Sequence, residues 1–101
     1  MLFLSILDKM NHVAENFTAN PGPIMYCVEA RAENFDRKDI PALAKSITRC
    51  LSDCYLKSFD DNSFVVEWEC FIVNVSFNVG SDGVDVATID MDLCDEVPFD
   101  F

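Results

Sequence analysis

The sequence predicts a two-layer α+β domain, in which two amphipathic helices pack on a mainly antiparallel sheet of about four strands in the order α-β-α-β-β-β. Two segments repeat apolar residues at helical spacing, and residues 63–93 alternate between apolar and polar side chains. Hairpin-type connections favour antiparallel pairing, and the two helices would cover one face of the sheet. A chain of 101 residues fits a single domain.

The first helix is expected over residues 2–17, where apolar residues follow the spacing i, i+3, i+4 and i+7. The segment Asn-Pro-Gly-Pro at 20–23 ends it, because two prolines and a glycine cannot continue a helix. Residues 24–32 then alternate in the manner of a strand. The apolar stripe of the helix consists of Phe3, Ile6, Leu7, Met10, Val13, Ala14 and Phe17.

The second helix is expected to begin with Asp39 as its N-cap and to run to about Lys57. Pro41 is tolerated in the first turn, where its missing N–H has no partner to lose. The apolar stripe of this helix would consist of Ile40, Leu43, Ala44, Ile47, Leu51, Cys54 and Tyr55.

The segment 60–62 is expected to be a turn that leads into the β-rich region. The apolar phase of this region inverts between Cys70 and Phe71, which indicates a bulge, a bend or a tight turn. The sequence Gly-Ser-Asp-Gly at 80–83 predicts a hairpin turn, followed by a return strand over 84–93. The sheet face away from the helices would expose polar side chains, namely Asn74, Ser76, Asn78, Asp90 and Asp92.

The acidic residues are concentrated in the C-terminal half of the chain. Residues 1–55 carry seven acidic and six basic side chains, whereas residues 56–101 carry eleven acidic side chains and one basic one. Like charges destabilise a compact state, so this concentration of acidic residues does not help the domain to fold. It instead favours solubility, electrostatic attraction of a partner during encounter, or selection of a basic partner. We divide the chain into an α+β domain at 1–93 and an acidic aromatic tail at 94–101.

The composition also excludes several classes of partner. A net charge of −11 disfavours direct binding to nucleic acid or to an anionic membrane. The apolar run at residues 1–7 lacks the basic region and the cleavage site of a signal peptide, and no stretch is long enough to span a membrane. We therefore expect a cytoplasmic protein.

No motif for catalysis or for a cofactor stands out. His12 is the only histidine and falls on the polar side of the first helix, and no EF-hand loop is present. The odd number of cysteines, without a CxxC knuckle, predicts free thiols buried in the core, with a zinc site as the minority interpretation. We expect no enzyme, no cofactor and no metal. The five cysteines are Cys27, Cys50, Cys54, Cys70 and Cys94.

A candidate binding surface is built from carboxylates. Asp90 and Asp92 would lie about 6.5–7 Å apart on one face of a strand, a repeat comparable to that of consecutive phosphates. Such a face can present Lys and Arg with an imitation of a nucleic-acid backbone, although a solvated face without a partner is the alternative. The expected contact residues are Asp85, Asp90, Asp92, Asp95 and Glu96, supported by Asp60, Asp61, Glu67 and Glu69, with Trp68, Phe99 and Phe101 as apolar anchors.

In size and charge the chain resembles the small acidic nucleic-acid-mimicking inhibitors of phages and mobile elements, such as anti-CRISPR and anti-restriction proteins. The resemblance implies a basic, nucleic-acid-binding target, for example a nuclease or a CRISPR effector subunit.

The tail carries a second resemblance. Val97-Pro98-Phe99, preceded by Asp95 and Glu96, is similar to the acidic tip that ends bacterial single-stranded DNA-binding proteins. That tip docks its terminal Phe in a basic-rimmed pocket of genome-maintenance enzymes. This chain departs from the pattern by the additional 100–101 dipeptide, and the alternative is that the tail aromatics fold back onto the core.

These observations together predict an inhibitor that covers a basic surface of a nucleic-acid-handling protein. The alternative is an acidic immunity protein or a secretion-type chaperone that binds one cognate basic protein.

Overall fold

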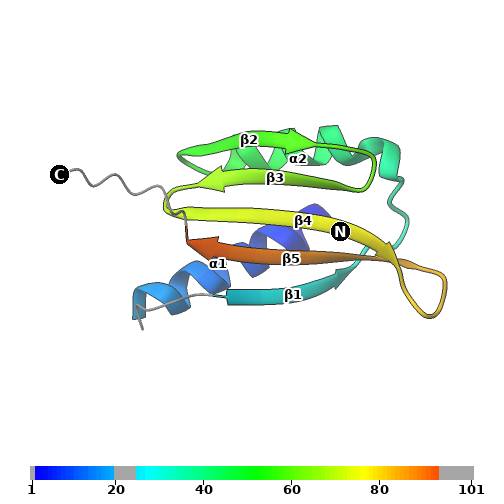
Figure 1. Ribbon diagram of the computed structural model, residues 1–101, viewed down its shortest axis with the longest axis horizontal. Coiled ribbons are helices and arrows are strands. Elements are labelled where there is room, and N and C mark those ends of the chain that lie inside the picture. Colours follow the sequence, from blue (N-terminus) through cyan, green and yellow to red (C-terminus); the bar gives the residue numbers. More distant parts are fainter. Residues whose placement is uncertain (1, 20–24, 94–101) are drawn as a thin grey trace.

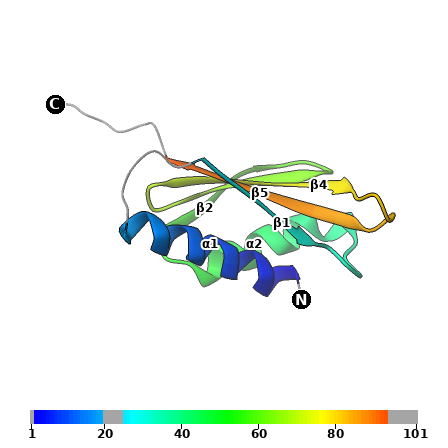
Figure 2. The same cartoon turned by 90° about the horizontal axis from the view of Figure 1, so that it is seen from below.

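Five strands form one antiparallel sheet, and two helices lie against one of its faces (Figures 1 and 2). The computed structural model describes residues 2–19 and 25–93. The elements are α1 (Leu2–Ala19), β1 (Met25–Arg31), the 3₁₀ turn η1 (Arg37–Asp39), α2 (Ile40–Cys50), β2 (Cys54–Phe59), β3 (Ser63–Trp68), β4 (Phe71–Val79) and β5 (Asp85–Leu93).

The strand order across the sheet is β1-β5-β4-β3-β2, and every neighbouring pair is antiparallel. Strands β2 to β5 form a meander, and β1 completes the sheet beside β5. This arrangement confirms the α+β class and the antiparallel pairing. The expected count of about four strands and the order α-β-α-β-β-β are wrong, because the described residues form five strands in the order α-β-α-β-β-β-β.

The missing strand is β2, which the sequence analysis assigned to the second helix. Helix α2 ends at Cys50, and the next residue, Leu51, is already extended with φ −119° and ψ 144°. Asp53 then takes a positive φ of 52°, which a helix does not contain. Residues from Cys54 onward pair with β3 instead. The apolar pattern at 51–55 fitted helical spacing, but pairing with the edge of β3 satisfies the backbone of this segment.

The entry to α2 also differs from the expectation. Asp39 occupies the N-cap position but makes no side-chain capping bond, whereas Pro41 lies in the first turn as expected. The capping carboxylate belongs to Asp36, which accepts a hydrogen bond from the Lys38 backbone N–H at 3.0 Å and so begins η1. The 3₁₀ turn places the cap three residues earlier in the chain than the helix pattern indicated.

The turns of the meander follow their sequence signals. At 60–62, the Asp60 carboxylate accepts backbone hydrogen bonds from Asn62 and Ser63 at 2.8 and 2.9 Å. The phase inversion at 70–71 is a two-residue turn, in which Glu69 has a φ of 56°. The hairpin turn at 80–83 is closed by the Gly80 N–H, which donates to the Val84 carbonyl at 2.8 Å.

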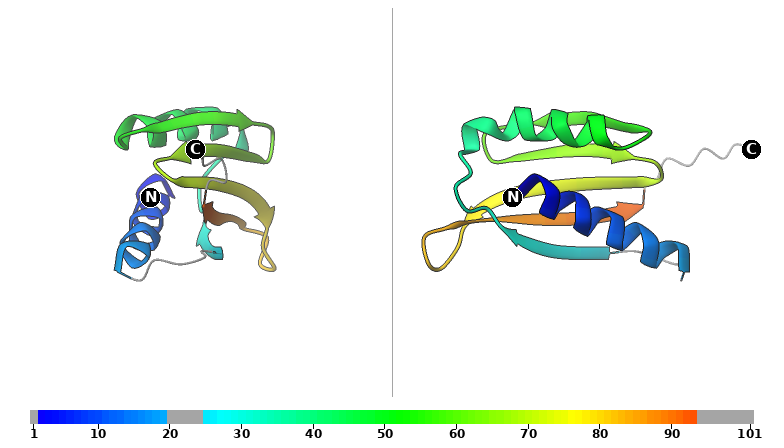
Figure 3. Two further views of the ribbon diagram at one scale, coloured as in Figure 1. Left: turned by 60° about the vertical axis from the view of Figure 1, so that its left-hand side comes forward. Right: turned by 180° about the vertical axis from the view of Figure 1, so that it is seen from behind.

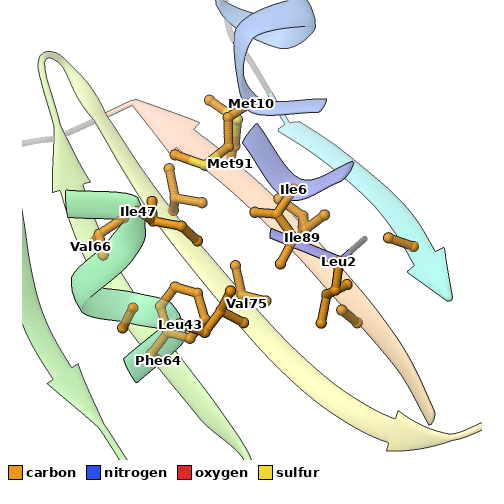
Figure 4. Close-up of a cluster of buried hydrophobic side chains, with 14 of the residues drawn as sticks. Leu2, Ile6, Met10, Leu43, Ile47, Phe64, Val66, Val75, Ile89 and Met91 are labelled. Carbon is orange, nitrogen blue, oxygen red and sulfur yellow. The ribbon is translucent and has the colours of Figure 1, made fainter. Parts of the chain in front are cut away.

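The core lies between the sheet and the two helices (Figure 4). Ile6 and Met10 of α1 point toward Ile89 and Met91 of β5, while α2 covers the β3 side of the sheet. The two helices lie side by side over different halves of the sheet, and no helix formed by the described residues lies on the opposite face (Figure 3). The fully buried side chains include Ile6, Met10, Val13, Ile40, Ile47, Phe64, Val66, Val73, Val75, Ile89 and Met91.

Three of the four described cysteines lie outside the core, which corrects the sequence interpretation, whereas Cys54 packs against the core. Cys27, Cys50 and Cys70 are exposed, Cys54 is half-buried, and all four are free thiols. Cys27 lies on the helix-free face of β1, Cys50 ends α2 and Cys70 lies in a turn, so each is at a position that solvent reaches. Cys94 lies outside the described residues. Within 2–19 and 25–93, no group of three or more His, Cys, Asp or Glu side chains is placed to hold a metal ion.

Candidate functional site

The sheet face that carries no helix, here called the open face, is the candidate binding surface. The strand register arranges its side chains in rows across the sheet. One row runs from Asp92 through Ile72 and Glu67 to Tyr55, and the next joins Cys27 to Asp90. Asn74, Ser76, Asn78, Asp90 and Asp92 lie on this face as expected, and all are exposed or half-buried.

Asp90 and Asp92, here called the carboxylate pair, stand on β5 with both side chains exposed. Because they are two residues apart, their side chains share the open face at a spacing of about 6.5–7 Å. As a hydrogen-bond partner and a negative neighbour, the Asp90 carboxylate raises the pKa of the Cys27 thiol. The thiol therefore stays protonated and adds no further charge next to the pair.

The predicted contact residues do not form one surface. The carboxylate pair and Glu67 lie on the open face, and Glu69 lies in the turn at the same end of the sheet as Asp92. Asp60, Asp61 and Asp85 lie at the opposite end. Seven residue steps along β5 separate Asp85 from Asp92, a distance of about 23 Å. Asp95, Glu96, Phe99 and Phe101 lie outside the described residues.

Asp85 has a structural role, which corrects its assignment to the acidic surface. Arg37 donates from Nε and Nη2 to the two oxygens of Asp85, at 2.9 and 3.0 Å, and from Nη1 to Asn62 Oδ1 at 2.8 Å. The arginine thus joins η1, β5 and the turn before β3. It neutralises Asp85, which is only 19% exposed, and holds the pKa of this carboxyl below its usual value.

Trp68 is not an exposed anchor, which is a second correction. It is 5% exposed and packs on the helix side of the sheet, with its ring centroid 5.7 Å from that of Phe71. Trp68 and Phe71 flank the two-residue turn, so both side chains point to the same face. A buried side chain of this kind is not available to a partner.

The charges are divided between the two layers of the fold. The helices carry two acidic and three basic residues, a net of +1, whereas the remaining described residues carry thirteen acidic and four basic ones, a net of −9. All four of these basic residues form ion pairs with carboxylates, so they neutralise acid locally and offer no surplus positive charge. They are Arg31, Arg37, Lys38 and Lys57. Nine of the thirteen acidic residues lie on the strands and the turns between them, together with two of the basic residues, a net of −7. The sheet therefore presents a negative layer, backed by helices that carry a net of +1.

The open face also has an apolar part, which the sequence pattern did not predict. Tyr55 is 63% exposed, and Val65 and Ile72 are half-buried there. Ile72 was visible in the sequence as an apolar residue in the polar phase of its strand. The exposure of Tyr55 was not predicted, because the helical pattern placed this residue in the buried stripe of the second helix.

Substitution of Asp85 by asparagine should lower the melting temperature at neutral pH. The melting temperature of the variant should also change less than that of the wild type as the pH falls. A carboxyl whose pKa is lowered by folding stabilises the protein above its unfolded pKa of about 3.9, and this contribution is lost as the pH falls through the folded value. Thermal melts from pH 7 to pH 3 would measure the effect. The control is Asp61→Asn in the neighbouring turn, and equal melting curves for the two variants would contradict the structural role of Asp85.

Comparison with known proteins adds no relative: no family model, curated protein or solved structure matches the chain. No helix in the described part of the chain has the length and apolar character needed to cross a membrane.

Proposed function

We propose that this protein acts by binding, not by catalysis, and that its open face covers a basic surface of a nucleic-acid-handling protein. It would thereby block access of nucleic acid, in the manner of a DNA-mimicking inhibitor such as an anti-CRISPR protein. The observation that supports this proposal is the layered charge distribution. Nine acidic residues lie on the strands and the turns between them, where both basic residues, Arg31 and Lys57, are already paired with a carboxylate.

The carboxylate pair is the proposed centre of the contact. Two exposed carboxylates at the spacing of successive same-face strand residues can each accept charge-assisted hydrogen bonds from Lys or Arg. A target that normally binds a row of phosphates has Lys and Arg side chains at a comparable spacing, and these can contact the two carboxylates. Since the target is built to hold an anionic polymer, protein and nucleic acid should compete for it.

The double substitution Asp90→Asn with Asp92→Asn should weaken target binding on the order of tenfold and leave the fold intact. Both side chains are exposed, so their loss removes interaction energy and does not disturb the core. The experiment immobilises the full chain, captures protein from extracts of the host, and elutes the captured protein with duplex DNA. The matched control is Asp8→Asn with Glu15→Gln, which removes two exposed charges from α1 on the opposite layer.

The expected result is that the wild type and the α1 control capture the same protein, that DNA releases it, and that the Asn variant retains little of it. Equal capture by all three proteins would refute a role for the open face. A captured protein that DNA does not displace would refute the mimic and would favour an immunity protein or a chaperone.

A further variant that lacks residues 97–101 tests the tail, which lies outside the described residues. If this deletion abolishes capture while the Asn variant binds normally, the tail is the docking element and the open face is not.

A further inference from the structure

The open face contains an apolar patch formed by Tyr55 on β2, Val65 on β3 and Ile72 on β4. Tyr55 and Ile72 are the cross-strand partners of Glu67 on its two sides, and Val65 precedes Glu67 by two residues on the same face. The three side chains therefore surround Glu67. This patch is here called the apolar triangle.

The centre of the apolar triangle is electrically balanced. Lys57, the extra residue of the bulge in β2, places its Nζ 3.6 Å from Glu67 Oε2. A partner that covers the triangle therefore meets an ion pair and not an isolated carboxylate. This matters because the burial of an uncompensated charge would oppose binding.

The apolar triangle borders directly on the carboxylate pair. Ile72 is opposite Asp92 and Asn74 is opposite Asp90, so the pair lies one strand spacing, about 4.8 Å, from β4. From β2 to β4 the triangle spans two such spacings, or about 10 Å. This width matches the diameter of an α-helix with its side chains, which is about 10–12 Å.

We propose that the segment of the partner that occupies the open face is a basic amphipathic helix. Its apolar stripe lies on Tyr55, Val65 and Ile72, and lysines or arginines on one flank meet Asp90 and Asp92. This inference rests on the proposed function and deepens it. A purely polybasic segment would satisfy the carboxylates but would leave the apolar triangle exposed to water, whereas an amphipathic helix complements both parts.

Two synthetic peptides of about 18 residues, five helical turns, test the proposal with the full-length protein. Both contain the same number of leucines and lysines. In one the leucines form a single helical stripe, and in the other the same residues are scrambled. Titration calorimetry at fixed salt should show that the stripe peptide binds at least about tenfold more tightly. Tyr55→Ser with Ile72→Thr should remove this preference and should leave the affinity for the scrambled peptide unchanged.

Controls assign the preference to the apolar triangle. Tyr55→Ser alone, at an edge position that is 63% exposed, should reduce the preference without affecting folding, as checked by thermal melts. Leu4→Ser removes an apolar side chain of similar exposure, 58%, from α1 and should change nothing. The proposal is overturned if the two peptides bind equally, if the Tyr55 variants keep the full preference, or if Leu4→Ser removes it.

The carboxylate variant separates failure of this inference from failure of the proposed function. If Asp90→Asn with Asp92→Asn weakens both peptides while the Tyr55 and Ile72 substitutions have no effect, binding is driven by charge alone and only the amphipathic helix is rejected. If the carboxylate variant changes neither affinity, the proposed function falls, and this inference falls with it.

Discussion

Substitution of Phe64 by alanine should lower the free energy of unfolding by about 3–5 kcal/mol, which is the range for removal of a large aromatic side chain from a packed core. Phe64 is 0% exposed and lies where β3 meets Leu43 of α2 (Figure 4). A domain of this size has a total stability of about 5–15 kcal/mol, so the variant would retain only part of it. Chemical denaturation with urea would measure the difference, provided that the slope of the transition is unchanged.

Phe59 offers a matched control for this substitution. It is the cross-strand partner of Phe64 on β2, but it lies at the edge of the sheet and is 50% exposed. Phe59→Ala removes the same atoms from a position that water already reaches, and it should cost less than about 1 kcal/mol. A loss of stability at Phe59 as large as that at Phe64 would contradict the assignment of Phe64 to the packed core and of Phe59 to the exposed edge of the sheet.

The parts of the fold that follow from sequence are those with a strong local signal. The seven apolar residues of the first helix repeat without interruption, and α1 covers the expected segment. Residues 80–83 contain two glycines, of which Gly83 takes a φ of 85°, and the hairpin forms there. In both segments the local pattern and the tertiary packing favour the same structure.

Strand β2 shows where this agreement ends. The residues from Leu51 to Tyr55 fit a helical stripe as well as a strand, so periodicity alone could not separate the two. The decision depends on the edge of β3, which offers backbone partners to this segment, and that information is not local. The same error concealed the exposed Tyr55 and therefore the apolar part of the open face.

The candidate site was predictable only in part for a similar reason. Alternation along β5 correctly placed Asp90 and Asp92 on one exposed face. Asp85 forms an ion pair with Arg37 and is therefore not part of the exposed acidic surface. Arg37 is 48 residues away in the sequence, and no spacing rule predicts such a pair. Formal charge therefore overestimates the acidic surface, because carboxylates with a structural partner contribute little to it.

Binding to the captured target should weaken by more than about tenfold between about 0.1 and 1 M NaCl. Over this range the Debye length falls from about 10 to about 3 Å, so exposed carboxylates lose their attraction to a basic surface. The nine acidic residues of the strands and their turns supply that attraction, because the two basic residues among them are already paired. Surface plasmon resonance on the wild-type protein would give the affinity and both rate constants at each salt concentration.

The two rate constants distinguish the charged part of the contact from the apolar part. Long-range attraction guides the encounter, so salt and the Asp90→Asn, Asp92→Asn variant should mainly lower the association rate. The apolar triangle acts only once the surfaces touch, so Tyr55→Ser should mainly raise the dissociation rate, and by the same factor at low and high salt. An affinity that is constant across the salt series would exclude electrostatics as the driving force. A salt effect confined to dissociation would place the carboxylates inside the contact, where they form short-range ion pairs, and not at its rim.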